Sequence, residues 1–426
     1  MLGTLSLPSR ARLKPLVVVS SFLTANTTMP YSVSVNQPLL GAAPDGAESK
    51  PHHVKNSHGT TTKFQNPHPS YKAAFQPWEF PIKSIMGQFD GTMRMPAPKG
   101  ETVPVQTPEF LASRHGSQDL RTTWLGHACH YVEFPSGLRA LFDPVMEDRC
   151  SPLTFAGPQR YTRRACAVAD LPFLDAVFIS HSHYDHLSLP TVHEVRSRFP
   201  HAHFFVGLGL AGWFRDSGVE NVTEMDWWED AEVTIKPDAD EKDDKDDKAA
   251  GQGIITAMVS CLPAQHGSAR SPFDHDKTLW CSWAVRSAAK SVYFAGDTGY
   301  RSIPAAIRDE EATHDYGGGQ LADLPTNPDF KAIGALRGPF DVGLIPIGAY
   351  RPRALFSPVH ASPSDAVEIF RDTRCGAALA IHWGTWALTS EPVMEPPVRL
   401  REALRRRGLP EEGVFDICDI GETRVF

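Results

Sequence analysis

Three histidines and an aspartate stand within six residues in the run His181-Ser182-His183-Tyr184-Asp185-His186. It directly follows the apolar stretch Ala-Val-Phe-Ile at 176–179, which we predict to be a buried strand. Several potential ligands therefore stand on one tight loop at the carboxyl end of a strand. Imidazole and carboxylate groups suit Zn²⁺ and similar cations, and a catalytic centre needs ligands on a rigid edge. A lone pair of histidines would indicate little, whereas H-x-H-x-D-H after an apolar strand specifically indicates a metal centre.

Short apolar runs bounded by turn residues continue on both sides of this loop, as expected for strands buried on at least one face. Strands are predicted at residues 122–124, 130–134, 140–142, 176–179, 254–261, 280–285, 291–294, 342–345 and 377–381. Helices are predicted at residues 189–198, 362–371 and 397–407. Ser362 or Ser364 is expected to cap the second helix, with Pro363 in its first turn. The mixture predicts an α/β chain.

This arrangement resembles the signature of the metallo-β-lactamase superfamily, which implies an αββα sandwich that binds two metals between its sheets. The superfamily also has a later histidine, an aspartate and a last histidine, each at the end of a strand. This sequence offers them in the same order as His266, Asp297 and His382. By resemblance, one metal is held by His181, His183 and His266, the other by Asp185, His186 and His382, and Asp297 bridges both.

Two such cations would activate a water molecule for hydrolysis. At a separation of roughly 3.5–4 Å they can lower the pKa of a bridging water to give hydroxide at neutral pH, and they can neutralise charge on a phosphoryl group. Further partners should orient the imidazoles, and Asp143, at the end of the apolar run 140–142, is the candidate. The alternative is that Asp143 only forms a turn before Pro144, since Asp is common in turns.

Flanking residues narrow the superfamily to a family, which matters because a fold alone does not determine function. Several motifs together resemble the N-acyl-phosphatidylethanolamine-hydrolysing phospholipase D family, and the resemblance extends from about Trp78 to the C-terminus. The motifs are Thr-Trp-Leu-Gly-His at 123–127, Gly-Pro-Gln-Arg-Tyr at 157–161, Asp-Trp-Trp-Glu at 226–229, Gly-Asp-Thr-Gly-Tyr at 296–300, Ile-Gly-Ala-Tyr at 347–350 and Ile-His-Trp-Gly-Thr at 381–385.

The family hydrolyses N-acylphosphatidylethanolamine to phosphatidic acid and an N-acylethanolamine with zinc-activated water. The resemblance thus implies a phospholipase D-type phosphodiesterase with two zinc ions per chain and a catalytic role for Asp185 besides its ligand role. His360, in Pro-Val-His, matches a further active-site histidine and is expected to donate a proton to the leaving alkoxide. A core histidine is the alternative. Several aromatic residues could line an acyl groove, although core packing is their more ordinary role: Trp124, Trp227, Trp228, Tyr350 and Trp386.

Two other kinds of function stay open on the sequence. The same centre could serve a hydrolase of a soluble phosphodiester, a lactone or a thioester, because the ligand set does not separate these substrates. A binding protein on a retired hydrolase fold should show lost ligands, and none of the implied ligands is missing.

Charge and cysteine content bear on partners and compartment. The net charge is -8, and the stretch 238–248 alone contributes -4 through seven acids and three lysines. The balanced remainder lacks the basic excess of a nucleic-acid binder, so no nucleic-acid partner is expected. Seven scattered cysteines without a C-x-x-C pair indicate reduced thiols inside a cell. No apolar run approaches the roughly 20 residues that span a bilayer. By resemblance, a phospholipid membrane surface is the expected partner, and a homodimer is left open.

The N-terminal part differs in composition from the rest. Residues 1–76 are predicted to be a largely disordered extension, and residues 77–426 the hydrolase domain, with a disordered acidic insertion at about 237–252. The first 44 residues lack Asp and Glu but contain Arg10, Arg12 and Lys14, a composition typical of a mitochondrial transit segment. A disordered tail, with Met29 as a second start, is the alternative. The nearby histidines lack the flanks of a buried site and are expected at the surface: His52, His53, His58 and His68.

Overall fold

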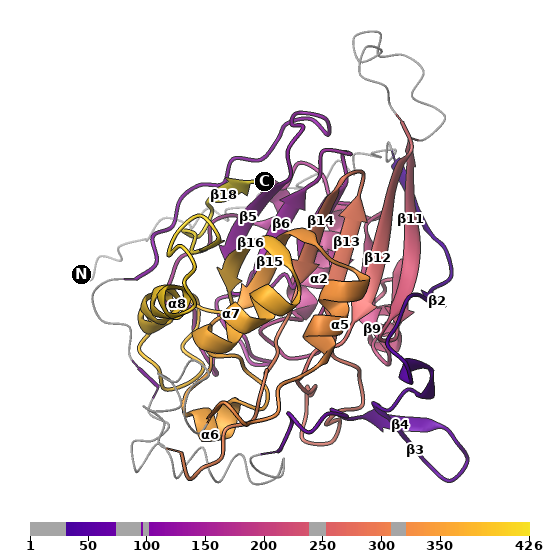
Figure 1. Cartoon of the computed structure of the whole chain (residues 1–426). Helices are drawn as coiled ribbons and strands as arrows, with labels where there is room; N and C mark the ends of the chain where they lie inside the picture. Colours follow the sequence, from indigo (N-terminus) through magenta and orange to yellow (C-terminus); the bar gives the residue numbers. More distant parts are fainter. Residues whose placement is uncertain (1–30, 74–94, 97–101, 238–252, 308–320) are drawn as a thin grey trace, which may run out of the picture.

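The strands form where β-branched and aromatic side chains cluster, because such side chains pack well on a pleated surface. The computed structural model of the chain describes residues 31–73, 95–96, 102–237, 253–307 and 321–426. Among these residues the strands join into two large sheets and one small hairpin (Figure 1). Residues 1–30, with the basic part of the predicted transit segment, and residues 238–252 of the predicted acidic insertion lie outside the described residues.

The first sheet runs from an antiparallel edge to a parallel half. Its spatial order is β1 (Tyr31–Val35), β11 (Glu229–Pro237), β12 (Ile255–Leu262), β13 (Ser282–Ser287), β14 (Lys290–Phe294), β15 (Phe340–Pro346), β16 (Cys375–Ile381) and β17 (Phe415–Asp416). The short β2 (Leu39–Leu40) also pairs with β11. Strands β14 to β17 are parallel, so their carboxyl ends lie at one edge of the sheet.

The second sheet has the same mixed character. Its order is β10 (Val222–Met225), β9 (His203–Gly207), β8 (Ala176–Phe178), β7 (Arg139–Phe142), β6 (Cys129–Glu133), β5 (Arg121–Gly126) and β18 (Thr423–Val425). Strands β7 to β10 are parallel, and β5, β6 and β18 pair antiparallel. The separate hairpin consists of β3 (His53–Lys55) and β4 (Thr61–Phe64).

Aromatic side chains join the two sheets face to face. On the second sheet the rings of Phe142, Phe178 and Phe205 stack in a row, with centroids 4.9 and 5.0 Å apart. Phe294 of the first sheet lies 5.0 Å from Phe142, and Trp283 lies 5.6 Å from Phe178. Each fully buried large apolar side chain stabilises the fold by about 1.5–3 kcal/mol. This layer therefore holds the strand ends of both sheets in a fixed relation.

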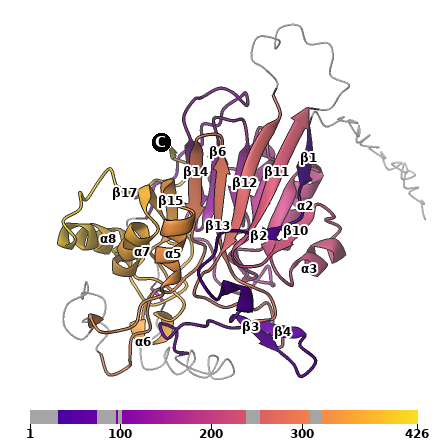
Figure 2. The ribbon, with the colours of Figure 1, turned by 45° about the vertical axis from the view of Figure 1, so that its right-hand side comes forward.

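Helices cover the outer face of each sheet (Figures 1 and 2). The second sheet carries α2 (Leu189–Arg198) and α3 (Ala211–Asp216), and the first carries α5 (Asp329–Leu336), α7 (Pro363–Asp372) and α8 (Glu395–Arg406), with the short α6 (Arg353–Phe356) below. The predicted αββα sandwich is confirmed. No helix in the described part of the chain is long and apolar enough to cross a membrane.

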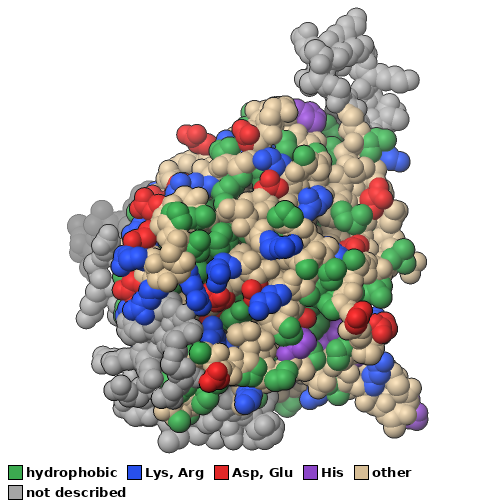
Figure 3. Space-filling view, in the orientation of Figure 1, with side chains coloured by type: hydrophobic (Ala, Val, Ile, Leu, Met, Phe, Trp, Pro, Cys, Tyr) green, Lys and Arg blue, Asp and Glu red, His purple; other side chains and the backbone are tan. Residues whose placement is uncertain are grey.

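The three predicted helices begin and end close to the predicted residues, and local chemistry explains why. Ser362 caps α7 by accepting a hydrogen bond from the Asp365 N–H, while the Asp365 carboxylate accepts one from the Ser362 N–H. Ser364, the other predicted cap, lies inside the first turn. The outer side of α8 carries ion pairs such as Arg405 with Glu411, and Figure 3 shows mixed charges in this region. These helices are thus apolar on one side and charged on the other.

Residues 31–73 correct the prediction of a largely disordered extension up to residue 76. Strand β1 pairs along its whole length with β11, and its Tyr-Ser-Val-Ser-Val sequence alternates between half-buried and exposed positions. His52, predicted at the surface, is 3% exposed, and the ring of His53 is nearly as covered. His58 is exposed as predicted, and His68 is half-buried. Composition misled here because the polar side chains of this segment have partners far away in the sequence.

Candidate metal centre

The predicted ligands all follow strands whose carboxyl ends meet at one edge of the sandwich. The loop 181–186 follows β8, and the other three residues follow β12, β14 and β16 as His266, Asp297 and His382. The ends are brought together because β8 and these three strands belong to the two facing sheets. The structure thus places all seven predicted ligands in one buried group, with Asp185 the most exposed of the acids at 16% of its side chain.

The first part of the group contains only histidines and is called the histidine cluster below. The Nδ1 atom of His183 lies 2.8 Å from Nε2 of His181 and 3.2 Å from Nε2 of His266. The other ring nitrogen of His266 is 2.8 Å from the carbonyl oxygen of Val359. Because a carbonyl can only accept, Nδ1 of His266 carries the proton and its Nε2 lone pair faces the cluster. Three neutral nitrogens thus converge on one point.

The second part of the group contains a carboxylate and is called the carboxylate cluster. The Oδ2 atom of Asp185 lies 3.3 Å from Nε2 of His186 and 3.4 Å from Nε2 of His382. A fourth residue, His127, was not predicted as part of the site, and its Nε2 is 3.0 Å from the same oxygen. The sequence held a signal for His127, since it ends the motif Thr-Trp-Leu-Gly-His at 123–127 of the resembled family, three residues after the predicted strand 122–124.

Asp297 lies between the two clusters. Its Oδ2 atom is 3.0 Å from Nε2 of His382, 3.2 Å from Nε2 of His186 and 3.8 Å from Nε2 of His266. One carboxylate oxygen therefore reaches histidines of both clusters, which is the position expected of a bridging ligand. The main chain brings it there because Asp297 follows β14, the strand between β13 and β15 in the first sheet.

Asp143 holds His186 from behind. Its Oδ2 accepts hydrogen bonds from Nδ1 of His186 at 2.7 Å and from the Ser180 hydroxyl at 2.5 Å, and its Oδ1 accepts from the Ser180 N–H. Burial raises the pKa of Asp143, and the nearby His186 opposes that rise. With its Nδ1 held in this way, His186 directs its Nε2 toward the carboxylate cluster. This is the orienting geometry that the sequence analysis expected of Asp143.

His360 lies beside Asp297 and His266, and the ligand atoms of these three residues lie close enough together to hold a metal ion. Its Nδ1 is 3.8 Å from Oδ2 of Asp297, and its ring centroid is 5.1 Å from that of His266 and 5.3 Å from that of His382. The side chain is 14% exposed, and the Arg353 guanidinium donates to its carbonyl oxygen. His360 is therefore not a fully enclosed core residue, and its Nδ1 faces the shared carboxylate of Asp297.

The residues fit a metal because their polar atoms converge but do not all form hydrogen bonds with one another. Among the described residues, Nε2 of His186, Nε2 of His382 and Oδ1 of Asp297 are buried and have no hydrogen-bond partner. An unpaired buried polar atom costs about 1–3 kcal/mol, and three within one cluster would be expensive. A cation that accepts these lone pairs removes the cost. Imidazole and carboxylate donors in this ratio are those of zinc and related divalent metals.

The two clusters differ in the pKa values of their histidines. Burial alone would lower the pKa of His382, but the carboxylates of Asp297 and Asp185 outweigh it and raise the pKa to about 9. The pKa of His186 is raised for the same reason, again against burial. In the histidine cluster, burial and then the ring of His266 lower the pKa of His183 to about 3. At neutral pH the carboxylate cluster without metal therefore carries at least one proton, while the histidine cluster is neutral.

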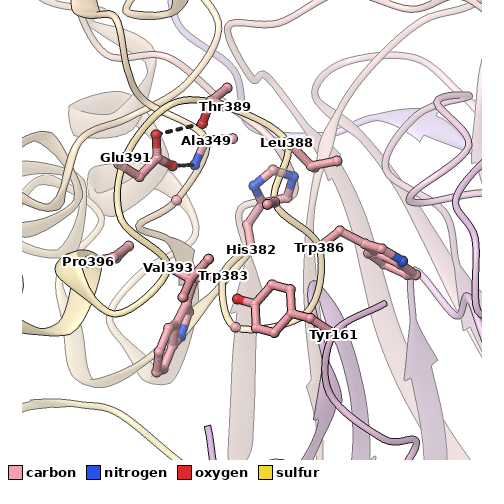
Figure 4. Close-up of a pocket in the computed structure, with 13 residues that line it drawn as sticks. Tyr161, Ala349, His382, Trp383, Trp386, Leu388, Thr389, Glu391, Val393 and Pro396 are labelled. Atoms are coloured by element: carbon pink, nitrogen blue, oxygen red, sulfur yellow. Dashed lines mark hydrogen bonds between the residues drawn. The ribbon is translucent and has the colours of Figure 1, made fainter. Parts of the chain in front are cut away.

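A small pocket adjoins the carboxylate cluster at His382 (Figure 4). Its wall includes Tyr161, Trp383 and Trp386, and on the other side the buried carboxylate of Glu391 accepts hydrogen bonds from the Ala349 N–H and the Thr389 hydroxyl. Of the aromatic residues considered for an acyl groove, Trp386 lines this pocket. The other four are buried in the core: Trp124, Trp227, Trp228 and Tyr350.

The fold and the donor set define a metal-dependent hydrolase of the metallo-β-lactamase type. Residues 139–383 match the family model described as beta-lactamase superfamily domain. The chain is 35% identical to the N-acyl-phosphatidylethanolamine-hydrolyzing phospholipase D 1 of Caenorhabditis elegans, over 72% of this chain and 76% of that protein. The chain therefore belongs to the beta-lactamase superfamily and, within it, to the N-acyl-phosphatidylethanolamine-hydrolysing phospholipase D family.

Two further similarities accompany this one. The Saccharomyces cerevisiae protein named N-acyl-phosphatidylethanolamine-hydrolyzing phospholipase D, mitochondrial, is 29% identical over 75% of this chain and 59% of its own length. Among solved structures, a metallo hydrolase from the archaeon Ignicoccus hospitalis is similar with a TM-score of 0.44 and 19% identity, covering 72% of this chain and 98% of that one.

Proposed function

We propose that this chain is a zinc-dependent phosphoric diester hydrolase of the phospholipase D type, with two zinc ions per chain. Its substrate in this proposal is N-acylphosphatidylethanolamine, and its products are phosphatidic acid and an N-acylethanolamine. The observation that carries the proposal is the single Asp297 oxygen within 3.0–3.8 Å of histidines from both clusters. The choice of substrate in this proposal rests on the name of the Caenorhabditis elegans relative.

The two cations, when bound, would activate water and balance the negative charge that develops on a phosphoryl group. The ligands in this proposal are His181, His183 and His266 for one ion, Asp185, His186 and His382 for the other, and Asp297 for both. The remaining residues act through hydrogen bonds. Asp143 sets the direction of the His186 ring, and His127 binds the Asp185 carboxylate from the side.

His360 is the proposed proton donor to the leaving alkoxide. In the substrate-free chain, burial lowers the pKa of His360 well below that of a free histidine, so the ring is neutral. An anionic phosphodiester next to the ring favours the imidazolium form, because an opposite charge nearby raises the pKa of a histidine. We therefore propose that His360 gains its proton as the substrate binds, and that the 14% of its side chain left exposed gives it access to the leaving group.

The lipid would reach the centre from a membrane surface. Phe273 is 85% exposed, and it lies in the loop that begins just after His266. The loop is rigid at this point because the Asp274 carboxylate accepts hydrogen bonds from the N–H groups of Arg270 and Ser271. The Arg270 guanidinium also donates to the carbonyl oxygens of Ser182 and Leu187 beside the metal loop. An exposed aromatic ring on a rigid turn is suited to insertion between lipid headgroups.

Mass spectrometry of the products formed in ¹⁸O-labelled water tests the proposal. The purified, metal-loaded protein is given N-acylphosphatidylethanolamine in mixed micelles, with a chelator-treated sample as control. Attack of water on phosphorus places the label in phosphatidic acid. Label in the N-acylethanolamine would indicate cleavage of the carbon–oxygen bond instead. Protein that leaves this lipid intact but hydrolyses a lactone, a thioester or a soluble phosphodiester would contradict the substrate assignment.

Membrane contact has its own test. Replacement of Phe273 by Ala should weaken binding to phosphatidylcholine vesicles by roughly 10–100-fold, since one buried aromatic side chain contributes about 1.5–3 kcal/mol. Hydrolysis of a short-chain, water-soluble analogue should stay unchanged, because Phe273 is not part of either cluster. Equal vesicle binding of the two proteins would contradict the proposed contact.

We also propose a mitochondrial location, supported by the basic, acid-free N-terminal composition and by the name of the yeast relative. A fluorescent fusion of the whole chain should co-localise with a mitochondrial marker, and removal of residues 1–28 should abolish this. A diffuse signal from the full-length fusion would contradict it.

A further inference from the structure

The segment 50–72, called the arm below, runs along the molecule from the edge of the first sheet to the metal centre. At its start three side chains bind one buried carboxylate, that of Asp226. The Lys50 ammonium and Nε2 of His52 each lie 2.7 Å from an Asp226 oxygen, and Nε2 of His53 lies 2.9 Å away. The His52 ring also stacks on Trp227, with centroids 4.2 Å apart. The beginning of the arm is therefore firmly fixed to the domain.

The end of the arm is fixed as well. Nε2 of His68 lies 2.8 Å from the Asp329 carboxylate at the start of α5. The Ser302 hydroxyl donates to the carbonyl oxygen of Ser70 and accepts from the Lys72 N–H, both at 2.7 Å. Between these two attachments the chain has little freedom. Side chains in the middle of the arm therefore take defined positions against whatever lies beside them.

Asn66, in this middle part, binds the main chain of His266 on both sides. Its Nδ2 donates to the His266 carbonyl oxygen at 2.7 Å, and its Oδ1 accepts from the His266 N–H at 3.2 Å. His266 lies beyond the end of β12. One amide side chain thus supplies both the donor and the acceptor that a neighbouring strand would have supplied.

Ser70, also in the arm, binds the side chain of Gln265, the residue before His266. Its hydroxyl donates to Oε1 of Gln265 at 2.6 Å, and Nε2 of Gln265 donates to the carbonyl oxygen of Pro358 at 2.9 Å. The Gln265 N–H in turn donates to the hydroxyl of Thr298, the neighbour of Asp297. The arm is therefore linked through Gln265 to the segments that carry Asp297 and His360.

We propose that Asn66 is a positioning residue that sets the place of the His266 imidazole, and that the arm thereby adjusts metal affinity in the histidine cluster. The inference rests on the proposed role of His266 as a ligand. His181 and His183 share one short loop, whereas His266 comes from a different strand end in the other sheet. The spacing between His266 and the other two histidines therefore depends on contacts that hold its main chain, and Asn66 makes two of them. The carboxylate cluster has no such contact with the arm among the described residues.

The experiment measures metal affinity rather than activity, so it does not depend on the lipid substrate. Metal-free protein is titrated with Co²⁺ against a chromophoric chelator, and the visible spectrum is recorded at each step. Asn66→Ala should weaken one of two binding steps by roughly 10–100-fold, the range usual for residues that orient a ligand. Asn66→Asp keeps the acceptor for the His266 N–H but places a carboxylate against the His266 carbonyl oxygen, so it should show a loss as well.

Two backgrounds identify the cluster that is affected. In an Asp185→Asn background, which damages the carboxylate cluster, Asn66→Ala should still weaken the remaining binding step. In a His183→Ala background, which damages the histidine cluster, Asn66→Ala should have no further effect on metal affinity. The matched control is Gln65→Ala, because the exposed Gln65 side chain donates to Pro51 within the arm itself.

The outcomes separate positioning from mere folding. Positioning predicts a changed Co²⁺ spectrum with a thermal midpoint of the metal-free chain equal to that of Gln65→Ala. Equal weakening of both binding steps, or unchanged affinity together with a lowered midpoint, would overturn the proposal and leave Asn66 a structural residue. A chain that binds two metals as described but does not hydrolyse N-acylphosphatidylethanolamine would contradict the proposed function and not this inference.

Discussion

The histidine cluster and the carboxylate cluster differ in the charge states of their ligands. The histidine cluster has neutral donors, because burial lowers the pKa values of His181 and His183, the latter to about 3. The carboxylate cluster contains Asp185 and shares Asp297, and these acids raise the pKa of His382 to about 9 despite burial. A metal entering the first cluster displaces no proton near neutral pH, whereas a metal entering the second displaces at least one.

The supports of the two clusters differ as well. In the histidine cluster, the Asn66 side chain holds the main chain of His266, and the carbonyl oxygen of Val359 holds its ring. In the carboxylate cluster both supports act on the side chains of the ligands, Asp143 on His186 and His127 on Asp185. A change at Asn66 or at His127 should therefore damage one cluster, whereas a change at Asp297, which both clusters share, should damage both.

Asp297→Asn should give the largest loss, because this is the shared residue. An amide lacks the negative charge that two cations require, so both metals should bind more weakly, by more than the roughly 10–100-fold expected for an orienting residue. Metal content by inductively coupled plasma mass spectrometry should fall from near two per chain, and turnover should fall with it. Full metal content and activity in this variant would contradict the proposal that Asp297 is a ligand of both metals.

His360→Ala should lower turnover by roughly 10²–10⁴, the usual range for loss of a proton donor, and leave metal content unchanged. The residue lies near both clusters and is not one of the seven predicted ligands, so this variant separates chemistry from metal binding. The exposed His58→Ala is a suitable control for loss of a histidine. If His360→Ala also lost metal, the residue would belong to one of the clusters.

His127→Ala should weaken metal binding in the carboxylate cluster alone, by roughly 10–100-fold. His127 binds Asp185 with hydrogen-bond geometry, and burial lowers its own pKa to about 3, so it is a neutral donor to that carboxylate. Stepwise Co²⁺ titration distinguishes the clusters. A loss in the histidine cluster would show that the two clusters are not supported separately.

The metal affinities of the two clusters should depend differently on pH, which is the smallest of the expected effects. The raised pKa values of His382 and His186 mean that protons compete with the metal at neutral pH, so the affinity of the carboxylate cluster should rise between pH 7 and 9. The slope for one displaced proton is about tenfold per pH unit. The affinity of the histidine cluster should stay constant across this window, since the pKa of His183 is already about 3. Parallel slopes for both binding steps would contradict the assignment.

Some features of this protein were determined by the sequence alone, because they depend on neighbours in the chain. The loop 181–186 carries its ligands within a few residues of a buried strand, and the later residues His266, Asp297 and His382 each follow an apolar run. Strands β5 to β8 and β12 to β16 were predicted for the same reason, since hydrophobic runs and turns are local signals. Together they carried the resemblance to the metallo-β-lactamase superfamily, and that resemblance implied the αββα fold and the ligand positions.

Other features were decided only by the tertiary structure, because they depend on residues that are far apart in the sequence. Asn66 meets His266 across 200 residues and His127 meets Asp185 across 58, and no local pattern predicts such pairs. Strand β1 has a polar, short sequence whose pairing partner β11 follows almost 200 residues later, roughly the same separation as for Asn66. The charge states of the two clusters are also set by folding, since burial and the approach of Asp297 shift pKa values that the free side chains would not show.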